Sequence, residues 1–189
     1  MSIIRTIPEA DATGVAAEAY ADDVRDQGFI ASHTRVMVTN PEAFAAWDAL
    51  ITAIARPMDK RRYELVTLAA ALGTKSLHCR LAHGRKSLSY IDEDELVRIA
   101  EDYRSAGLTE AEVAMMEFAE RVGTDAASMT DADSLRLREL GLSDREIVDI
   151  TLAAAARNYY SRALQALAVD LDVTPGITPR LHDALVAGI

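Results

Sequence analysis

Apolar residues along the chain recur with a period close to 3.6, the repeat of an amphipathic α-helix. Phe44, Trp47, Leu50, Ile51 and Ile54, for example, fall on one helical face. The strict alternation that marks a strand is nearly absent. The pattern predicts helices near 9–25, 41–55, 59–72, 76–89, 92–105, 109–123, 131–140 and 144–170, with a short one after Pro179.

The ends of several predicted helices carry capping residues. Thr109 with Glu112 and Ser143 with Glu146 fit the capping box, in which two side chains satisfy the first backbone N–H groups of a helix. Since these signals agree with the apolar period, we predict an all-α fold, a helical bundle of about eight helices.

Nothing in the chain resembles a linker that would split it into two large domains. The segment 172–179, with its prolines and glycine, predicts a loop. We therefore expect a single domain over residues 1–175 and a C-terminal arm over residues 176–189. The sustained apolar face of the predicted helix 144–170 suggests that this helix runs through the centre of the domain.

Charge limits the classes of partner. The chain has 189 residues, with 20 lysines and arginines against 30 aspartates and glutamates, a formal net charge of −10. Such a charge repels nucleic-acid phosphates and anionic lipid, so we expect neither nucleic acid nor a membrane as partner. The first residues lack the apolar core of a secretory signal, and no apolar run reaches the roughly 18 residues of a membrane span, so we expect a cytoplasmic location.

The chain contains one cysteine, Cys79. One thiol cannot form an internal disulfide, and four histidines with one cysteine have no zinc-finger spacing, so we expect no metal and no cofactor. Cys79 is therefore either a small buried core residue or a reactive group.

Candidate chemistry lies between Glu64 and His83. Ser76, Cys79 and His83 are three and then four residues apart, so in a helix they project from one face, whereas His78 points elsewhere. A break at Gly73 can fold the preceding helix back, so that Glu64 faces them.

If Ser76 lies at or near the helix start, Cys79 falls in the first turn, where free N–H groups and the helix dipole stabilise a thiolate. His83 can then serve as base and Glu64 as its orienting group, which gives a relay of Glu64, His83 and Cys79. The spacing alone equally allows an ordinary core cysteine and a satisfied histidine.

The segment also resembles the motif of alkylhydroperoxidase D-like and carboxymuconolactone decarboxylase-like proteins: a glutamate, eleven residues, then C-x-x-C-x-x-x-H. Glu64, Cys79 and His83 match its glutamate, second cysteine and histidine, and Ser76 stands where the first cysteine would be. His78 lies where some members carry a histidine. The resemblance implies the alkylhydroperoxidase D-like helical bundle, with Cys79, His83 and Glu64 as catalytic residues and Ser76 and His78 in support.

A second segment, RNYYSRAL from Arg157, resembles peroxidase-related members of that family, with Asn158 and Arg162 at the matching positions. The stretches Ile7–Ala10 and Asn40–Glu42 are also similar to that subgroup. The resemblance covers most of residues 3–173. It implies a homo-oligomer, and the apolar residues Val113, Met115, Met116 and Phe118 are compatible with a subunit interface or with an ordinary core.

Ser76 is the departure from the family pattern that matters most. Members with two cysteines use the first one to resolve the oxidised second one, which this chain cannot do. We expect one-cysteine chemistry, in which a small hydroperoxide oxidises Cys79 to a sulfenic acid and an external thiol reduces it.

Three functions follow from these residues. The first is a thiol-dependent peroxidase or oxidoreductase of peroxiredoxin type, acting in antioxidant defence. The second is a carboxymuconolactone decarboxylase-like enzyme acting on a small cyclic acid, in which Glu64 and His83 move protons and Arg35 or Arg162 holds a carboxylate. The third is a non-catalytic oligomeric member of the family.

Overall fold

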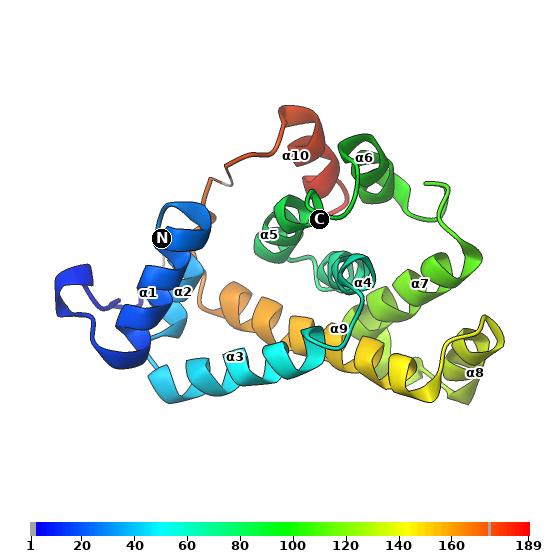
Figure 1. Ribbon diagram of the computed structural model, residues 1–189, viewed down its shortest axis with the longest axis horizontal. Helices are drawn as coiled ribbons and strands as arrows, with labels where there is room; N and C mark the ends of the chain where they lie inside the picture. The colour runs from blue at the N-terminus through cyan, green and yellow to red at the C-terminus, as the bar shows by residue number, and fades with distance from the viewer. Residues whose placement is uncertain (1–2, 174) are drawn as a thin grey trace.

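Helices make up the regular structure that the computed structural model describes, over residues 3–173 and 175–189 (Figure 1). The predicted all-α fold is confirmed. The helices are α1 (Gly14–Gln27), α2 (Ser32–Met37), α3 (Pro41–Ala55), α4 (Lys60–Gly73), α5 (Leu77–Ser87), α6 (Glu93–Asp102), α7 (Glu110–Asp125), α8 (Asp131–Glu139), α9 (Asp144–Ala166) and α10 (Pro179–Val186), with two short 3-10 helices, η1 (Glu9–Asp11) and η2 (Ala126–Ser128).

Both capping boxes form as predicted, and they start α7 and α9. The N-terminal prediction of one helix over 9–25 is wrong, because Ala12 and Thr13 are extended and separate η1 from α1. Helix α2 was not predicted, since six residues are too few to show a clear apolar period. The long helix stops at Ala166 and not at 170, since Ala168 takes a left-handed backbone conformation, with φ of 47°.

Helix α4 forms the centre of the domain and packs against α5, α7 and α9 (Figure 1). Nine of its residues are buried, from Tyr63 to Ala71. The prediction that α9 occupies the centre is wrong, because Val148, Leu152 and Tyr159 on its outer side are exposed. The apolar stripe of α9 therefore did not reveal that α4 is the helix surrounded by others.

Helices α4 and α7 approach one another very closely. A Cβ atom added to Gly73 would lie 2.3 Å from the backbone oxygen of Glu120, and one added to Gly123 would lie 3.0 Å from the oxygen of Ala70. Glycine at both places lets the two backbones touch. The contact holds the end of α4, and with it the turn that leads into α5.

The apolar residues Met115, Met116 and Phe118 of α7 are buried in the chain's own core. The hypothesis that they leave a surface for another subunit is therefore wrong, because α7 turns this face toward α4 and α9. The homo-oligomer that the family resemblance implies stays a prediction.

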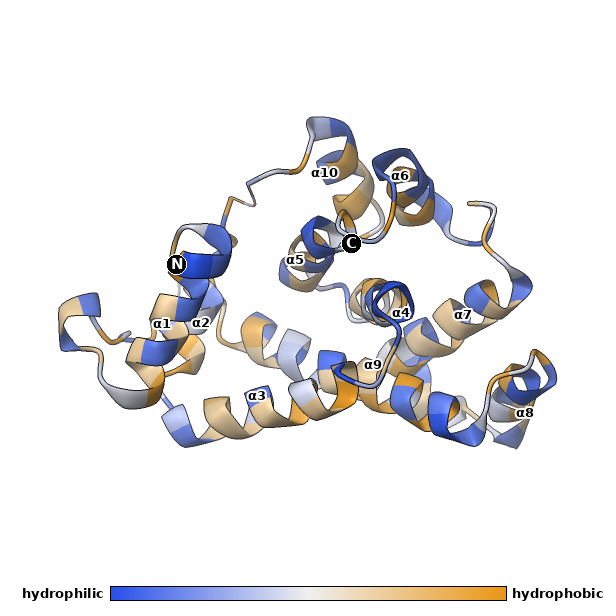
Figure 2. Cartoon of the chain, in the orientation of Figure 1, coloured by the Kyte–Doolittle hydropathy of each residue, from blue (hydrophilic) through white to orange (hydrophobic). Residues whose placement is uncertain are grey.

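Helix α10 packs against α5 and α6, and Leu181 and Leu185 lie fully within the core. Figure 2 shows hydrophilic residues on the outer side of α6 and hydrophobic ones toward α10. The predicted division of the chain near residue 175 stays a prediction. In the part of the chain that the structure describes, no helix combines the length and the apolar character needed to cross a membrane.

A buried arginine joins four of these helices. Arg80 of α5 donates to the backbone oxygens of Leu68, Ala100 and Leu185, on α4, α6 and α10. Burial lowers its pKa to about 10. Because three buried carbonyls depend on this guanidinium, it fixes α5 in place relative to its neighbours.

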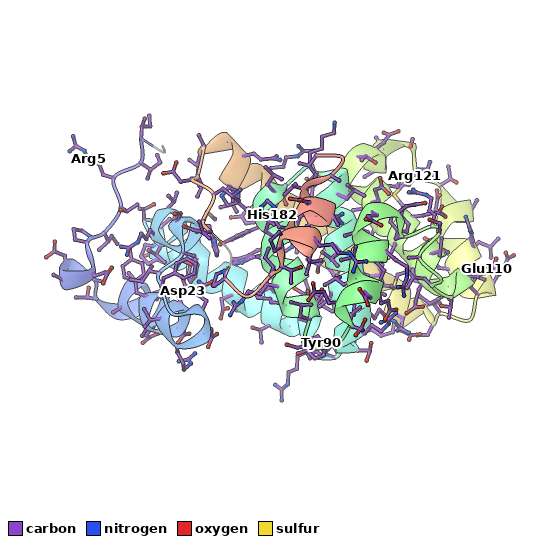
Figure 3. The ribbon with its side chains drawn as sticks, turned by 90° about the horizontal axis from the view of Figure 1, so that it is seen from above. Arg5, Asp23, Tyr90, Glu110, Arg121 and His182 are labelled. Atoms are coloured by element: carbon purple, nitrogen blue, oxygen red, sulfur yellow. The ribbon has the colours of Figure 1, made fainter. Side chains whose placement is uncertain are left out.

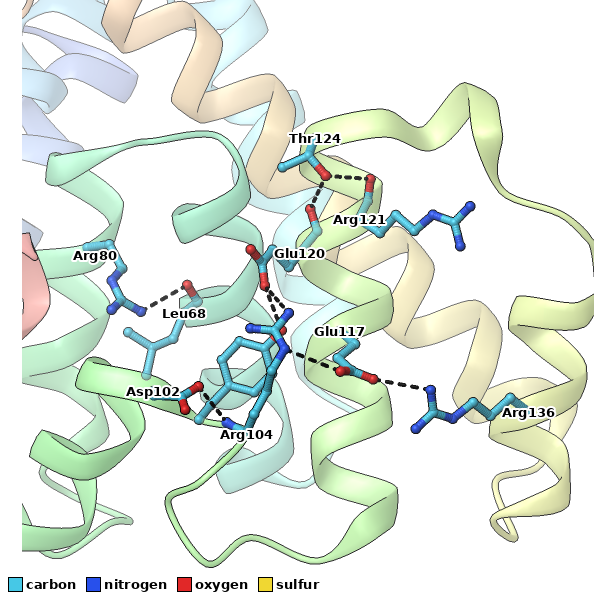
Figure 4. A network of polar contacts seen from close by, with 10 residues as sticks. Leu68, Arg80, Asp102, Arg104, Glu117, Glu120, Arg121, Thr124 and Arg136 are labelled. Atoms are coloured by element: carbon cyan, nitrogen blue, oxygen red, sulfur yellow. Dashed lines mark hydrogen bonds and ion pairs between the residues drawn. The ribbon is translucent and has the colours of Figure 1, made fainter. Parts of the chain in front are cut away.

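Ion pairs cover the outside of the fold. Figure 4 shows Arg104 bound to Glu117 and Glu120 of α7, and Arg136 of α8 bound to Glu117. Figure 3 shows charged side chains along the whole molecule, with Arg121 toward the end opposite α1. Such partly exposed pairs stabilise a fold only weakly, so the core carries most of the stability.

Candidate active site

Helices α4 and α5 bring the predicted residues together. Ser76 is the N-cap of α5, and its hydroxyl accepts a hydrogen bond from the backbone N–H of Cys79, at 3.4 Å. Cys79 thus lies in the first turn of the helix, as expected from the spacing. Because the hydroxyl of Ser76 serves as a helix cap, its position there is explained by local structure alone.

Glu64 and His83 form a buried pair between α4 and α5. Nδ1 of His83 lies 2.7 Å from Oε2 of Glu64, and both side chains are less than a tenth exposed. A carboxylate accepts from the N–H of the ring, which leaves Nε2 as the free nitrogen with a lone pair.

The surroundings keep this histidine neutral and the glutamate ionised. Burial, together with the positive charge of Arg157, lowers the pKa of His83 to about 4. Burial opposes the charge of Glu64, but the pairing with His83 and the cations Lys86 and Arg157 outweigh it and lower the pKa of its carboxyl. The pair therefore presents a neutral base held in one orientation.

The sulfur of Cys79 contacts α9. The hydroxyl of Ser161 lies 3.3 Å from Sγ, and one terminal nitrogen of Arg157 lies 3.7 Å from it. Both donors come from one face of α9, four residues apart. Over the described residues 3–173 and 175–189, Cys79 forms no hydrogen bond with His83, so the predicted relay is not a chain of direct contacts.

Cys79, His83 and Glu64 nevertheless line one cavity of about 440 Å³, together with Arg157. Trp47 and Tyr160 form an aromatic wall in it, stacked with ring centres 4.8 Å apart. The three predicted residues thus share a space large enough for a small organic molecule, lined by both apolar and charged side chains.

Other residues singled out from the sequence lie in different places. His78 also lines the cavity, and its Nε2 contacts the backbone oxygen of Asp170 at 3.0 Å. Arg35 pairs with Glu9, and Arg162 donates to Gln165 and to a backbone oxygen. The decarboxylase hypothesis expects one of these arginines to hold the substrate carboxylate. Neither arginine lines the cavity, so neither can do so there.

Sequence reasoning missed Arg157 and Ser161. Both stand in the RNYYSRAL segment, in which Asn158 and Arg162 are the positions that match the family. The available signal was the four-residue spacing of two polar residues among alanines on an otherwise buried helix face. His33, whose pKa burial lowers to about 4, is a further cavity residue that the sequence did not indicate.

Within residues 3–173 and 175–189, no group of three or more histidine, cysteine or acidic side chains is arranged to hold a metal ion.

Acid should weaken the fold through His83. Its pKa in the unfolded chain is about 6.5, so between pH 6.5 and 4 the unfolded state takes up a proton that the folded state does not. Stability should fall as pH falls through this window, by at most about 3 kcal/mol from this one residue. Urea unfolding at pH 7.5 and 4.5 measures the loss.

The matched comparison uses two variants. His83→Gln should show a smaller loss than the wild type, whereas His182→Gln, an exposed histidine on α10, should lose as much as the wild type. Equal losses in all three proteins would show that His83 is not the acid-sensitive group.

Comparison with known proteins identifies the fold. A scan against family models and a search of curated proteins found no match to the sequence. Among solved structures, an uncharacterised peroxidase-related protein with an alkylhydroperoxidase AhpD core, from Ralstonia eutropha JMP134, superposes with a TM-score of 0.81 and 21% identity, over 90% of this chain and 92% of that one.

Two further structures are similar. A protein of unknown function from Agrobacterium tumefaciens, proposed to be the antioxidant defence protein AhpD, has 27% identity and a TM-score of 0.64, over 71% of this chain and 94% of that one. The debrominase Bmp8 has 16% identity and a TM-score of 0.81, over 97% of both chains. A second structure of it holds 2,3,4-tribromopyrrole in a C82A variant.

Proposed function

We propose that this chain, whose fold is shared with alkylhydroperoxidase D-like and peroxidase-related structures, is a single-cysteine thiol oxidoreductase acting on hydroperoxides. One observation carries this proposal: the sulfur of Cys79 has two polar donors and shares a cavity with an oriented, neutral histidine. Such surroundings suit an attacking thiolate better than an inert core cysteine.

The proposed reaction has two stages. The Cys79 thiolate attacks the terminal oxygen of the hydroperoxide, the O–O bond breaks, and a sulfenic acid and an alkoxide form. His83 takes up the proton of the attacked hydroperoxide O–H at Nε2 and passes it to the alkoxide, while Glu64 holds the ring, and the sulfenate left on Cys79 gains a proton from solvent. An external thiol then converts the sulfenic acid to a mixed disulfide and water, and a second thiol releases Cys79 and an external disulfide.

A trapping experiment tests the first stage. The reduced protein is treated with cumene hydroperoxide or hydrogen peroxide in the presence of a sulfenic-selective reagent, and the adduct is located by mass spectrometry. We expect an adduct on Cys79 that grows with peroxide concentration and is absent in Cys79→Ser. No adduct at concentrations that oxidise a true thiol peroxidase would contradict the proposal and leave the non-catalytic hypothesis.

A second candidate activity is thiol-dependent dehalogenation of an aromatic ring. The aromatic wall of the cavity and its volume favour it, as does the fold shared with a debrominase. Here the Cys79 sulfur takes the bromine, and a proton from solvent replaces it on the ring carbon. An external thiol then displaces bromide from sulfur to give a mixed disulfide, and a second thiol releases Cys79 and an external disulfide. Bromide release from 2,3,4-tribromopyrrole, measured with and without added thiol, distinguishes this activity from the first.

The acid/base alternative has less support, since neither Arg35 nor Arg162 lines the cavity. It is still separable by experiment, because turnover of a cyclic acid by Glu64 and His83 would survive in Cys79→Ala. Loss of all activity in that variant supports the thiol chemistry.

We also propose a homo-oligomer and a cytoplasmic location. An exposed apolar stripe on the outer side of α9, which contains Val148, Leu152 and Tyr159, supports the first of these, because such stripes are commonly covered by another subunit.

A further inference from the structure

We infer that Arg157 and Ser161 of α9, and not His83, hold Cys79 in its thiolate form. The inference deepens the proposed function, because it assigns the positioning residues of the same cysteine. It rests on which groups contact the sulfur and on which of them carry a positive charge.

The contacts favour α9. The terminal nitrogen of Arg157 and the hydroxyl of Ser161 lie within 3.7 Å of Sγ, whereas the hydrogen bond of His83 goes to Glu64. Two donors from one rigid helix face approach the sulfur together with the first turn of α5, where the helix dipole also favours negative charge.

The burial of Arg157 adds an independent reason. Its side chain lies in the core at 6% exposure, and over the described residues no carboxylate forms an ion pair with it. Its Nε is buried without a hydrogen-bond partner in the same part of the chain. A buried cation without a direct ion pair is costly. The ionisable groups that hydrogen-bond to Arg157 are the Cys79 sulfur and the Tyr63 phenol, and a thiol loses its proton more readily than a phenol.

Other charged or titratable groups near Cys79 do not replace Arg157. From α4, Glu64 is negative and opposes a thiolate, and Tyr63 is a neutral phenol, as is Tyr160 of α9. From α2 and α5, His33 and His83 are neutral, because burial lowers the pKa of each to about 4.

Two further side chains of α5, those of His78 and Lys86, form no hydrogen bond with the sulfur in the part of the chain that the structure describes. His78 is tied to a backbone oxygen, and Lys86 lies two turns along the helix, where its charge acts on Glu64 and His83. A guanidinium keeps its positive charge at every pH used in an experiment, whereas a histidine loses its positive charge as the pH rises through its pKa. The stabilisation of the thiolate by Arg157 should therefore not depend on the protonation of the partner.

The experiment measures the thiolate without peroxide. Thiolate absorbance at 240 nm and the rate of alkylation by iodoacetamide are followed from pH 4 to 10. Arg157→Met should move the midpoint upward by ~1 pH unit or more, so that alkylation below the midpoint slows about tenfold. Ser161→Ala should move it in the same direction by about half a unit.

The controls separate the two candidate partners of the sulfur. His83→Gln should leave the midpoint unchanged, and Arg157→Lys should restore at least half of the shift, because it keeps a positive charge. Circular dichroism shows whether each variant is folded. If Arg157→Met does not fold, Ser161→Ala and Arg157→Lys serve as the test. Ser161→Ala removes a hydrogen bond to the sulfur and Arg157→Lys replaces the planar guanidinium by an ammonium, so the midpoint of each variant must still move upward.

Two outcomes would overturn the inference: a midpoint that moves more in His83→Gln than in the α9 variants, or one that moves in none of them. Because no hydroperoxide is used, the outcome is independent of the trapping experiment. The expected shifts without a sulfenic adduct would leave the inference standing and remove the proposed function.

Discussion

Replacing Glu64 by glutamine should slow the oxidation of Cys79 by hydroperoxide about 100-fold, although the side chain keeps its size. Glu64 accepts the Nδ1 hydrogen of His83 at 2.7 Å. A glutamine amide can instead donate to Nδ1, which moves the ring proton to Nε2 and removes the lone pair from the nitrogen that is free. The loss of a positioned base typically costs a factor of 10² to 10⁴.

The rate of sulfenic acid formation, measured in single-turnover mixing with the trapping reagent, checks this expectation. Glu120→Gln is the matched control, because Glu120 of α7 binds Tyr103 and Arg104, which follow α6, and does not line the cavity. A Glu64→Gln protein that reacts as fast as the control would show that the buried pair only stabilises the fold.

Replacing Gly73 by alanine should lower the free energy of unfolding by about 3 kcal/mol, at the upper end of overpacking effects. The new Cβ would lie 2.3 Å from the backbone oxygen of Glu120, and a backbone atom cannot rotate away as a side chain can. Helices α4 and α7 must then separate. For a chain of this length the midpoint of thermal unfolding should fall by roughly 10 °C.

Gly84→Ala offers a matched comparison within the same domain. Its Cβ would lie 2.3 Å from Cδ1 of Leu185, the far end of a side chain that can shift, so we expect a loss of only about 1 kcal/mol. Urea unfolding of both variants measures the difference. If Gly73→Ala proved as stable as the wild type, the close contact between α4 and α7 would be refuted.

Local chemistry allowed the sequence to predict most of the helices. A cap such as Ser143 with Glu146 acts within four residues, and an apolar period acts within one helix, so both are visible without the fold. The sequence did not predict the short helix α2 or the extended break at Ala12 and Thr13, because neither contains enough residues for a periodic signal.

The sequence also did not predict which helix is central. The long apolar stripe of α9 predicted that this helix lies at the centre of the domain. The central helix is instead α4, which is enclosed by α5, α7 and α9 and is more deeply buried. Which helix lies in the middle depends on how several helices pack together. The glycines that permit the closest approach, Gly73 and Gly123, acquire their meaning only from the neighbours they touch.

Local sequence patterns predict an all-α chain and place Ser76, Cys79 and His83 on one helix face, since spacings of three and four residues are set by helix geometry. Only the tertiary structure brought Arg157 and Ser161 to the sulfur, across 78 and 82 residues of chain. It also lowered the pKa of His83 by burying the ring. Contacts over such distances depend on how whole helices cross, and no local pattern records that crossing.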